Sequence, residues 1–295
     1  MNSPAKKVKV LVMSVGPQAK NYTVKYLKKI GTPAESICVC LPNQYKENAS
    51  TYTDCEVFLY DEQKYINDDF DFYGFKKRNC GGVGRQGIAE ATEKYGDDWI
   101  CFQIDDDTSN FNVRKLVNGK YKSASIKHWS SIEKMVNVFY EFWELTGIEI
   151  AATVGASIPN TESAIQTRKI YNNFIMHKGN RLNFDGFRSL SSDDNRFNLM
   201  NNLIALHPMA ATPLFNITFH QAQGDRDDGN AVIYNGDYSW KKSFYIRMLI
   251  PFAANATINE EANRKLFRES IAQSKIYPDW VLTDDNGKVV GKAKV

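Results

Sequence analysis

The sequence predicts an α/β fold with a mixed, mostly parallel sheet flanked by helices. Apolar segments typical of buried strands alternate with amphipathic segments through the first part of the chain, which indicates parallel β-α units. The 295 residues are enough for one large α/β domain with a sizeable core. A composition of 43% hydrophobic and 24% charged residues is ordinary for a globular chain. With no linker that would divide the chain, we expect a single compact domain over residues 1–295.

The first elements follow from runs of apolar residues. Residues 8–15, VKVLVMSV, are almost unbroken in apolar and β-branched side chains, which predicts a buried strand that Gly16-Pro17 ends. A helix is expected over residues 21–30, where apolar residues share one face. Two more strands are expected over residues 36–41 and 57–60.

A polar segment separates these elements from the next strand. Residues 61–80 are expected to be a loop, and residues 80–87, CGGVGRQG, a glycine loop that enters a helix ending near Tyr95. Residues 99–104, WICFQI, predict a strand buried on both faces. Asp105-Asp106-Asp107 follows this strand directly.

The second half mixes both kinds of element. Its strongest signal is a helix over residues 130–145, where apolar residues recur at helical spacing. Further strands are expected over residues 148–154, 169–176, 214–219 and 231–234, and further helices over residues 194–204, 238–249 and 260–274.

Net charge, apolar runs and cysteine number bear on the partners and the cellular compartment of the protein. A formal net charge of +3 neither requires nor excludes a polyanionic partner. No apolar run approaches the roughly 18 residues of a membrane helix, and the polar N-terminus lacks the apolar core of a signal peptide. The five cysteines are an odd number in a large domain, which favours reduced thiols. We therefore expect a cytoplasmic protein with no membrane partner.

The three aspartates are the strongest candidate for a functional site. Ligands of open α/β sheets bind outside the carboxyl ends of the strands, where this triplet is expected. Three adjacent carboxylates repel one another unless a cation offsets their charge, and Mg²⁺ or Mn²⁺ with a diphosphate does so well. Alternate residues of an extended segment point the same way, so Asp105 and Asp107 could face one ligand. The competing interpretation is a solvated acidic turn.

The glycine segment allows an interpretation from another class. Gly82-x-Gly84-x-x-Gly87 matches the dinucleotide fingerprint, and Asp105 lies near the position of its ribose-binding acid, which would suggest an NAD-dependent oxidoreductase. No good strand precedes the fingerprint, at least three strands come before it, and ribose needs one carboxylate rather than three. A loop that places Arg85 and a helix N-terminus near donor phosphates is the favoured interpretation, with a plain helix entry as the alternative.

Weaker candidates lie in the second half. Asp193 and Asp194, before an expected helix, could form a helix cap or supply a general base. His220 ends an expected strand and is a candidate third metal ligand, although a lone histidine is more often structural. Two basic clusters, residues 76–78 and 240–242, could contact phosphates and bases, but short basic runs are usually solvated surfaces.

The segment over residues 81–107, GGVGRQGIAEATEKYGDDWICFQIDDD, resembles the GT-A glycosyltransferases. In that family a segment with glycine and arginine opens a helix, and the strand that follows ends in an Asp-x-Asp motif. The segment is more narrowly similar to the TET-associated and bacteriophage DNA-base glycosyltransferases, which show a G-x-x-R-N helix start followed by DDD. The first strand, VLVMSVG, and the acidic pair Asp193-Asp194 also fit this family.

The resemblance implies a GT-A fold in which residues 1–110 bind the nucleotide-sugar and residues 111–295, with a C-terminal helix, bind the acceptor. It implies transfer of a hexose or pentose from a UDP-sugar to a hydroxyl, with Mn²⁺ or Mg²⁺ as cofactor. The implied acceptor is 5-hydroxymethylcytosine in double-stranded phage DNA, with a glycan or protein acceptor as the alternative within the class. A further alternative to an enzyme is a catalytically inactive binding module that keeps the aspartates. The implied site has Asp107, Asp105 and His220 at the metal, Asp194 or Asp193 as base, and donor contacts from Ser14, Val15, Gly84, Arg85, Asp105 and Asp106.

Overall fold

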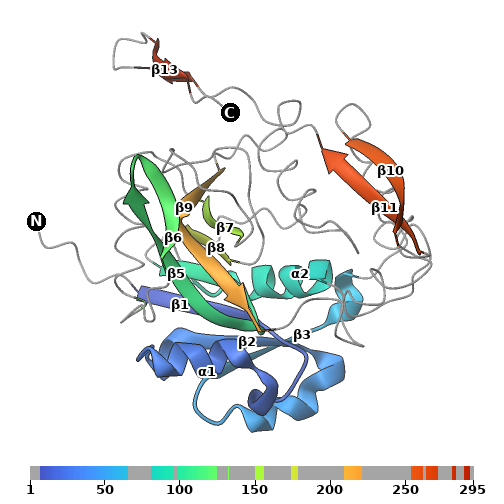
Figure 1. Ribbon diagram of the computed structural model, residues 1–295. Helices are drawn as coiled ribbons and strands as arrows, with labels where there is room; N and C mark the ends of the chain where they lie inside the picture. Colours follow the sequence, from blue (N-terminus) through green and yellow to red (C-terminus); the bar gives the residue numbers. More distant parts are fainter. Residues whose placement is uncertain are drawn as a thin grey trace, which may run out of the picture.

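The computed structural model describes residues 7–65, 81–95, 99–124, 132, 150–155, 174–178, 209–220, 254–261, 264–271, 281–283 and 289–292. The described strands are β1 Lys7–Met13, β2 Ile37–Pro42, β3 Glu56–Tyr60, β4 Trp99–Asp105, β5 Thr108–Val117, β6 Lys120–Ala124, β7 Ile150–Gly155, β8 Phe174–Lys178, β9 Met209–Phe219, β10 Ala254–Glu261, β11 Arg264–Ile271, β12 Val281–Thr283 and β13 Val289–Lys292 (Figure 1). The described helices are α1 Tyr22–Lys29 and α2 Gly81–Thr92, with short 3-10 helices η1 Gln18–Lys20, η2 Ala34–Ser36, η3 Asn43–Thr51 and η4 Glu62–Tyr65.

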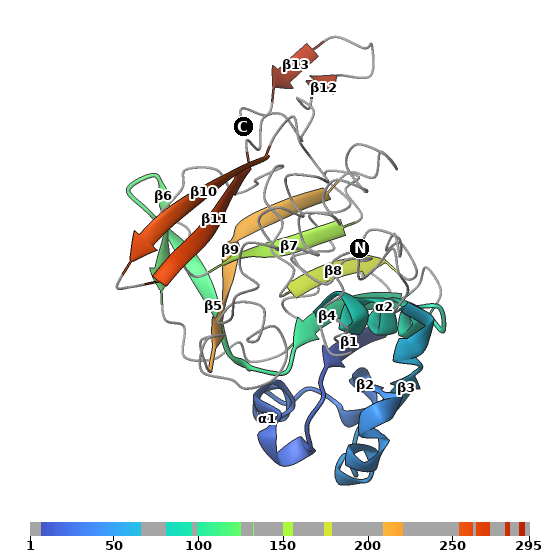
Figure 2. The same ribbon diagram turned by 90° about the vertical axis from the view of Figure 1, so that its right-hand side faces the viewer.

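Nine of the described strands form one sheet in the order β3-β2-β1-β4-β8-β7-β9-β5-β6 (Figure 2). The first four strands in this order pair in parallel, as does β7 with β9. β4 with β8, β7 with β8, β5 with β9 and β5 with β6 pair antiparallel. The expected mixed α/β sheet flanked by helices is therefore confirmed, with its parallel part built from the N-terminal strands.

Within the described part of the chain, α1 packs on one face of the parallel strands and α2 on the other, and Figure 1 shows the two helices on opposite sides of β1 and β2. Val8, Val10 and Val12 of β1 share a core with residues of α1. Leu11 lies on the other face, in a core with Val83 and Ile88 of α2. The apolar run of β1 is thus explained by burial on both faces.

Several predicted elements are confirmed, with ends that differ by a few residues. They are the strands β1, β2, β3, β4, β7, β8 and β9 and the helix α1. Of the helix predicted over residues 130–145, the structure describes Ile132, which is helical and 2% exposed. The elements expected at residues 194–204, 231–234 and 238–249 lie outside the described residues. The division into donor and acceptor halves stays a prediction.

Two predictions of local structure are wrong. The expected glycine loop is helical, because α2 already begins at Gly81 and contains the glycines of the fingerprint. The helix expected over residues 260–274 is instead part of an antiparallel hairpin, in which β10 pairs with β11. Its residues have good helix propensity, but pairing with a second strand overrides a preference of a few tenths of a kcal/mol per residue.

The sequence prediction also missed the hairpin of β5 and β6. Asn118 and Gly119 connect the two strands with positive φ angles of 51° and 74°. Both angles are those of a two-residue type I′ turn, for which Asn-Gly is the preferred sequence. The dipeptide was therefore the signal that would have predicted this hairpin.

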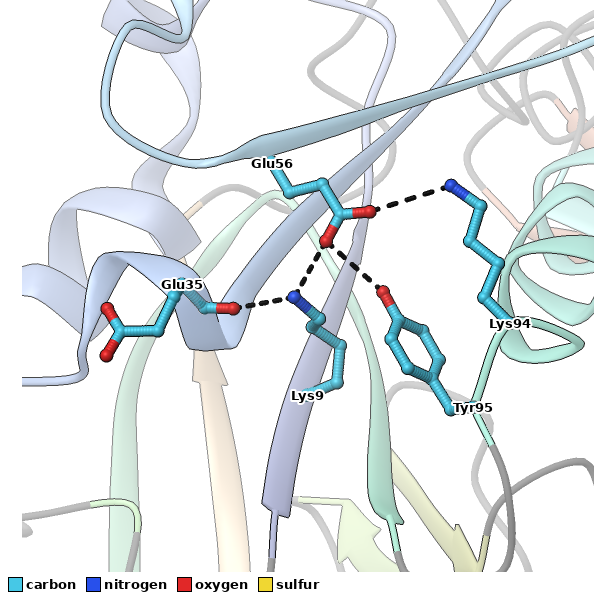
Figure 3. A network of polar contacts seen from close by, with 5 residues as sticks. All are labelled: Lys9, Glu35, Glu56, Lys94 and Tyr95. Atoms are coloured by element: carbon cyan, nitrogen blue, oxygen red, sulfur yellow. Dashed lines mark hydrogen bonds and ion pairs between the residues drawn. The ribbon is translucent and has the colours of Figure 1, made fainter.

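An ion-pair network around the buried Lys9 lies near the start of β1, away from the carboxyl ends of the strands (Figure 3). Lys9, only 4% exposed, donates from Nζ to a Glu56 carboxylate oxygen at 2.7 Å and to the Glu35 carbonyl oxygen at 2.6 Å. Tyr95 donates to the same carboxylate at 3.3 Å, and Lys94 Nζ lies 3.6 Å from its other oxygen. The network joins β1, β3 and the turn that follows α2.

None of the helices in the described ranges is long and apolar enough to cross a membrane. Four of the cysteines, Cys38, Cys40, Cys55 and Cys101, are free thiols, as the sequence predicts.

Candidate functional site

The aspartate triplet lies at the carboxyl edge of the parallel strands. β1 and β4 are neighbours in parallel, and Met13 pairs with Asp105. The residues that follow, Ser14 on one strand and Asp106 on the other, therefore meet at the same edge of the sheet. This is the edge at which open α/β sheets bind ligands.

Asp105 is paired with a buried arginine. Arg85 of α2 donates from Nη2 to Asp105 Oδ1 at 3.0 Å, and the Arg85 side chain is only 4% exposed. With its amide oxygen turned to the guanidinium, Gln103 accepts from Arg85 Nη1 at 2.7 Å and from Nε at 3.3 Å. Gln103 and Asp105 lie two residues apart on the strand and so share the face covered by α2. Arg85 therefore lies beside the aspartate triplet, and its expected contact with donor phosphates stays a prediction.

Asp106 belongs to a buried polar network on the opposite face. It is 8% exposed, and its Oδ2 accepts from the Ser14 hydroxyl at 2.7 Å. Tyr52 Oη lies 3.4 Å from Ser14 Oγ and accepts from Asn21 Nδ2 at 3.3 Å. Burial, and the charge of Asp106, raise the pKa of Tyr52, whose hydroxyl therefore stays protonated as a donor.

The same network fixes the loop between β1 and α1. Tyr52 Oη donates to the Gly16 carbonyl oxygen at 2.8 Å, and Asn48 Nδ2 donates to the carbonyl oxygen of Val15 at 3.0 Å. Ser14 and Val15, both expected to contact the donor, are thus held beside Asp106. These contacts hold the backbone of the loop in place at the carboxyl edge of the sheet.

Asp107 and His220 are joined through the backbone. The His220 amide donates to the Asp107 carbonyl oxygen at 2.8 Å, which ties the end of β9 to the acidic triplet. The exposed imidazole of His220 stacks on Tyr22, with ring centroids 3.6 Å apart and an interplanar angle of 22°. His220 therefore lies next to the aspartates, as a metal ligand would have to, with one ring face covered by Tyr22.

The glycines of α2 have a packing role that the fingerprint did not suggest. A Cβ on Gly84 would lie 2.0 Å from Met13 Sδ, and one on Gly87 would lie 2.4 Å from the Tyr60 ring. These short distances show that α2 approaches β1 and β3 closely at the two glycines. The dinucleotide interpretation needs these glycines in a strand-to-helix loop, and they lie within the helix instead.

The structure brings Ser14, Arg85, the three aspartates and His220 to one edge of the sheet. Asp193, Asp194 and the two basic clusters lie outside the described residues. Sequence analysis missed Thr23, Tyr52, Asn21 and Gln103. Two of these left a signal: Asn21 directly precedes a helix, where asparagine is a preferred cap, and Gln103 is a polar residue within an otherwise apolar strand.

The oxygen donors at this edge suit a hard divalent cation. Within the described ranges, no three His, Cys, Asp or Glu side chains lie close enough together to hold a metal ion by themselves. A Mg²⁺ or Mn²⁺ ion would therefore complete its shell with water and ligand oxygens. Binding through one or two carboxylates plus substrate phosphates is the usual arrangement for Mg²⁺.

Comparison with known proteins gives no family model and no curated protein that matches the chain. Among solved structures, the chain is similar to glucosyl-3-phosphoglycerate synthase from Mycobacterium tuberculosis in complex with Mn²⁺, uridine diphosphate and phosphoglyceric acid. That alignment has a TM-score of 0.43 and 10% identity and covers 90% of this chain and 86% of that chain. The complex of the same protein with Mg²⁺ and uridine diphosphate gives a TM-score of 0.44 at 10% identity over 90% and 88% of the two chains. Because both scores are below 0.5, the interpretation of the site rests on the residues of this chain.

Proposed function

We propose that this protein is a metal-dependent glycosyltransferase of the GT-A type that transfers a sugar from a UDP-sugar to a hydroxyl group. The observation that carries the proposal is the Asp105-Asp106-Asp107 triplet at the carboxyl edge of β1 and β4, with Arg85 ion-paired to its first member. The resemblance of residues 81–107 to GT-A enzymes supports the same function.

Electrostatics favours a cationic ligand at this edge. Three consecutive carboxylates repel one another, and the repulsion grows as they are withdrawn from water. Arg85 offsets the charge of Asp105, and the Ser14 hydroxyl stabilises that of Asp106. A divalent cation, bound through Asp107 together with a diphosphate, would offset the remaining negative charge of the triplet. When bound, such a metal acts as a Lewis acid that stabilises charge on a leaving diphosphate.

The residues of the chain have distinct tasks in this proposal. The β1–α1 loop, with Ser14 and Val15, borders the donor, and its anchoring by Tyr52 and Asn48 reduces the entropy lost on binding. Arg85 offsets the charge of Asp105 and fixes the direction of its carboxylate. His220, whose amide bonds to the Asp107 carbonyl, is proposed to contact the metal or the diphosphate, and Asp194 or Asp193 is the proposed general base.

The donor half of this proposal is tested by binding of UDP with and without metal. We expect isothermal titration to show UDP binding that depends on Mn²⁺, and Asp107→Asn to abolish that dependence, because it removes the charge that pairs with the cation. Asp54→Asn, which changes an exposed carboxylate in η3–β3, serves as control and should bind as the parent does. Stabilisation by NAD(H) and none by UDP with Mn²⁺ would instead favour an oxidoreductase and overturn the proposal.

The acceptor is proposed from the resemblance alone: 5-hydroxymethylcytosine in double-stranded DNA, with a glycan or protein as the alternative. Incubation with labelled UDP-sugars, Mn²⁺ and either hydroxymethylated or unmodified DNA separates these acceptors. We expect label to enter the hydroxymethylated DNA only. Donor hydrolysis or glycan labelling, without transfer to DNA from any donor, would remove the DNA acceptor while leaving the glycosyltransferase proposal in place.

A further inference from the structure

The first turn of α1 lies directly on the acidic triplet. Thr23 is fully buried, with 0% exposure, and contacts the triplet through both its side chain and its backbone. Its hydroxyl donates to the Asp105 carbonyl oxygen and accepts from the Thr108 amide, the latter at 3.0 Å. Its own amide donates to the Asp106 carbonyl oxygen at 3.1 Å. One residue therefore bonds to the backbone on both sides of Asp107.

These bonds replace contacts that the sheet does not supply. β4 ends at Asp105 and β5 begins at Thr108, but the two strands are not neighbours, because β8, β7 and β9 lie between them in the sheet. The chain leaves one strand and enters the other without a shared ladder of hydrogen bonds. The Thr23 hydroxyl, as donor to one strand end and acceptor from the other, bridges this break.

The position of Thr23 is itself fixed by neighbouring contacts. Asn21 caps α1 by accepting from the Val24 amide at 2.9 Å, and Tyr22 stacks on His220. The turn that carries Thr23 is thus attached to the Tyr52 network on one side and to the end of β9 on the other. These two attachments restrict the movement of Thr23.

We propose that Thr23 is a positioning residue that sets the backbone from which the Asp105 and Asp107 carboxylates extend, and so sets the affinity of the site for a metal–diphosphate pair. This inference rests on the donor function proposed above. Thr23 touches neither donor nor metal in this scheme, and its effect passes through the conformation of the acidic turn.

Two substitutions at this position separate the hydroxyl from side-chain volume. Thr23→Val keeps the branched shape but removes the hydroxyl that bonds to the Asp105 carbonyl and the Thr108 amide. Thr23→Ser keeps the hydroxyl and loses only a methyl group. Val24→Ala is the matched control, because Val24 is equally buried in the same turn of α1 and contributes to the apolar core.

The first measurement is isothermal titration of UDP in the presence of Mn²⁺ and in EDTA. We expect Thr23→Val to weaken the Mn²⁺-dependent affinity about tenfold, as for a lost hydrogen bond of average strength, with little change in EDTA. Thr23→Ser should restore the parent affinity, and Val24→Ala should lower the melting temperature without changing the metal dependence. Equal losses for Thr23→Val and Val24→Ala would overturn the proposal in favour of a purely structural role.

The second measurement needs no ligand and keeps the two proposals distinguishable. Hydrogen exchange of the peptide that contains Thr108 should be faster in Thr23→Val than in Thr23→Ser or Val24→Ala, after correction for global stability. Unchanged exchange in Thr23→Val would overturn the role of Thr23, whatever the titration shows. Faster exchange, in a protein whose parent form does not bind UDP with Mn²⁺, would overturn the donor function while confirming that Thr23 holds the turn.

Discussion

Arg85 and Asp105 form an ion pair between a buried guanidinium and a partly exposed carboxylate, with 4% and 23% of the two side chains accessible. Such a pair contributes little net stability relative to apolar residues, but the loss of one partner leaves the other charge unsatisfied. The two possible losses differ in cost. Loss of Asp105 would leave the charge of Arg85 buried, whereas loss of Arg85 leaves a carboxylate that reaches water. The pair therefore constrains both the stability of the protein and the chemistry of the acidic turn.

At the residue scale, we predict that Arg85→Met destabilises the protein by about 2–3 kcal/mol, below the full cost of breaking a buried pair because Asp105 reaches water. The measurement is urea denaturation. Lys64→Met is the matched control, since Lys64 forms an exposed pair with Glu90 at 3.2 Å and its loss should cost under about 1 kcal/mol. Similar costs for the two variants would contradict a special role for the Arg85 pair.

At the element scale, the close approach of α2 to the sheet determines which residues fit at its glycine positions. Alanine favours a helix over glycine by about 1 kcal/mol, so local propensity alone predicts that replacing a glycine of α2 is stabilising. The packing predicts the opposite, since a Cβ on Gly87 would meet three atoms of the Tyr60 ring within 2.6 Å. Either the buried Tyr60 ring or the helix must therefore shift.

We predict that Gly87→Ala lowers the free energy of unfolding by about 1–3 kcal/mol, as expected for overpacking. Gly84→Ala should cost less, because its neighbour Met13 has a flexible side chain that can repack. Chemical denaturation of both variants, alone and with Tyr60→Leu, measures the difference. If Gly87→Ala is stabilising, or if Tyr60→Leu does not relieve it, close packing of the helix is not the reason for the glycine.

The same elements show what the sequence could and could not predict. β1, β2 and β4 are long apolar runs whose burial is evident locally, and α1 has a capping asparagine and one apolar face. The glycines of α2 could not be interpreted locally, because their reason lies in Met13 and Tyr60 of other strands. The hairpin of β10 and β11 was missed because pairing between strands is not visible in helix propensity.

The residues of the candidate site also fall into two groups, those that the sequence indicates and those that it does not. The aspartates and Arg85 were predictable from type and position. Thr23 and Tyr52 were not, since threonine in a helix and tyrosine after a polar segment carry no local signal of the partners they meet.

At the scale of the whole molecule, the network around Glu56 couples stability to pH. Burial raises the pKa of Glu56, but the hydrogen bond and charge of Lys9, with the charge of Lys94, outweigh it and hold the pKa below its ordinary value of 4.5. A carboxylate with a lowered pKa in the folded state stabilises the protein above its unfolded pKa and loses that contribution as pH falls through the folded value. The network should therefore weaken below about pH 4.5.

We predict that Glu56→Gln destabilises the protein at pH 7 by on the order of 1 kcal/mol, because it leaves the buried Lys9 ammonium without its counter-charge. The difference from the parent should shrink as pH falls below 4.5, where the parent carboxylate becomes protonated. Urea denaturation from pH 3 to pH 7 tests this. Asp54→Asn, in an exposed pair, should change stability little at any pH, and a constant Glu56→Gln penalty across the range would contradict the prediction.

The hydrogen bond from the His220 amide to the Asp107 carbonyl has a consequence for how the protein is made. A ribosome delivers the aspartates long before it delivers the strand end that secures them. A nascent chain that has emerged only as far as residue 110 carries every carboxylate of the triplet, yet it lacks β9 and the imidazole that stacks on Tyr22. The contact between His220 and the acidic triplet therefore forms only after β9 has been synthesised. A fragment cut at the boundary between the two proposed halves would contain the acidic residues but lack this contact.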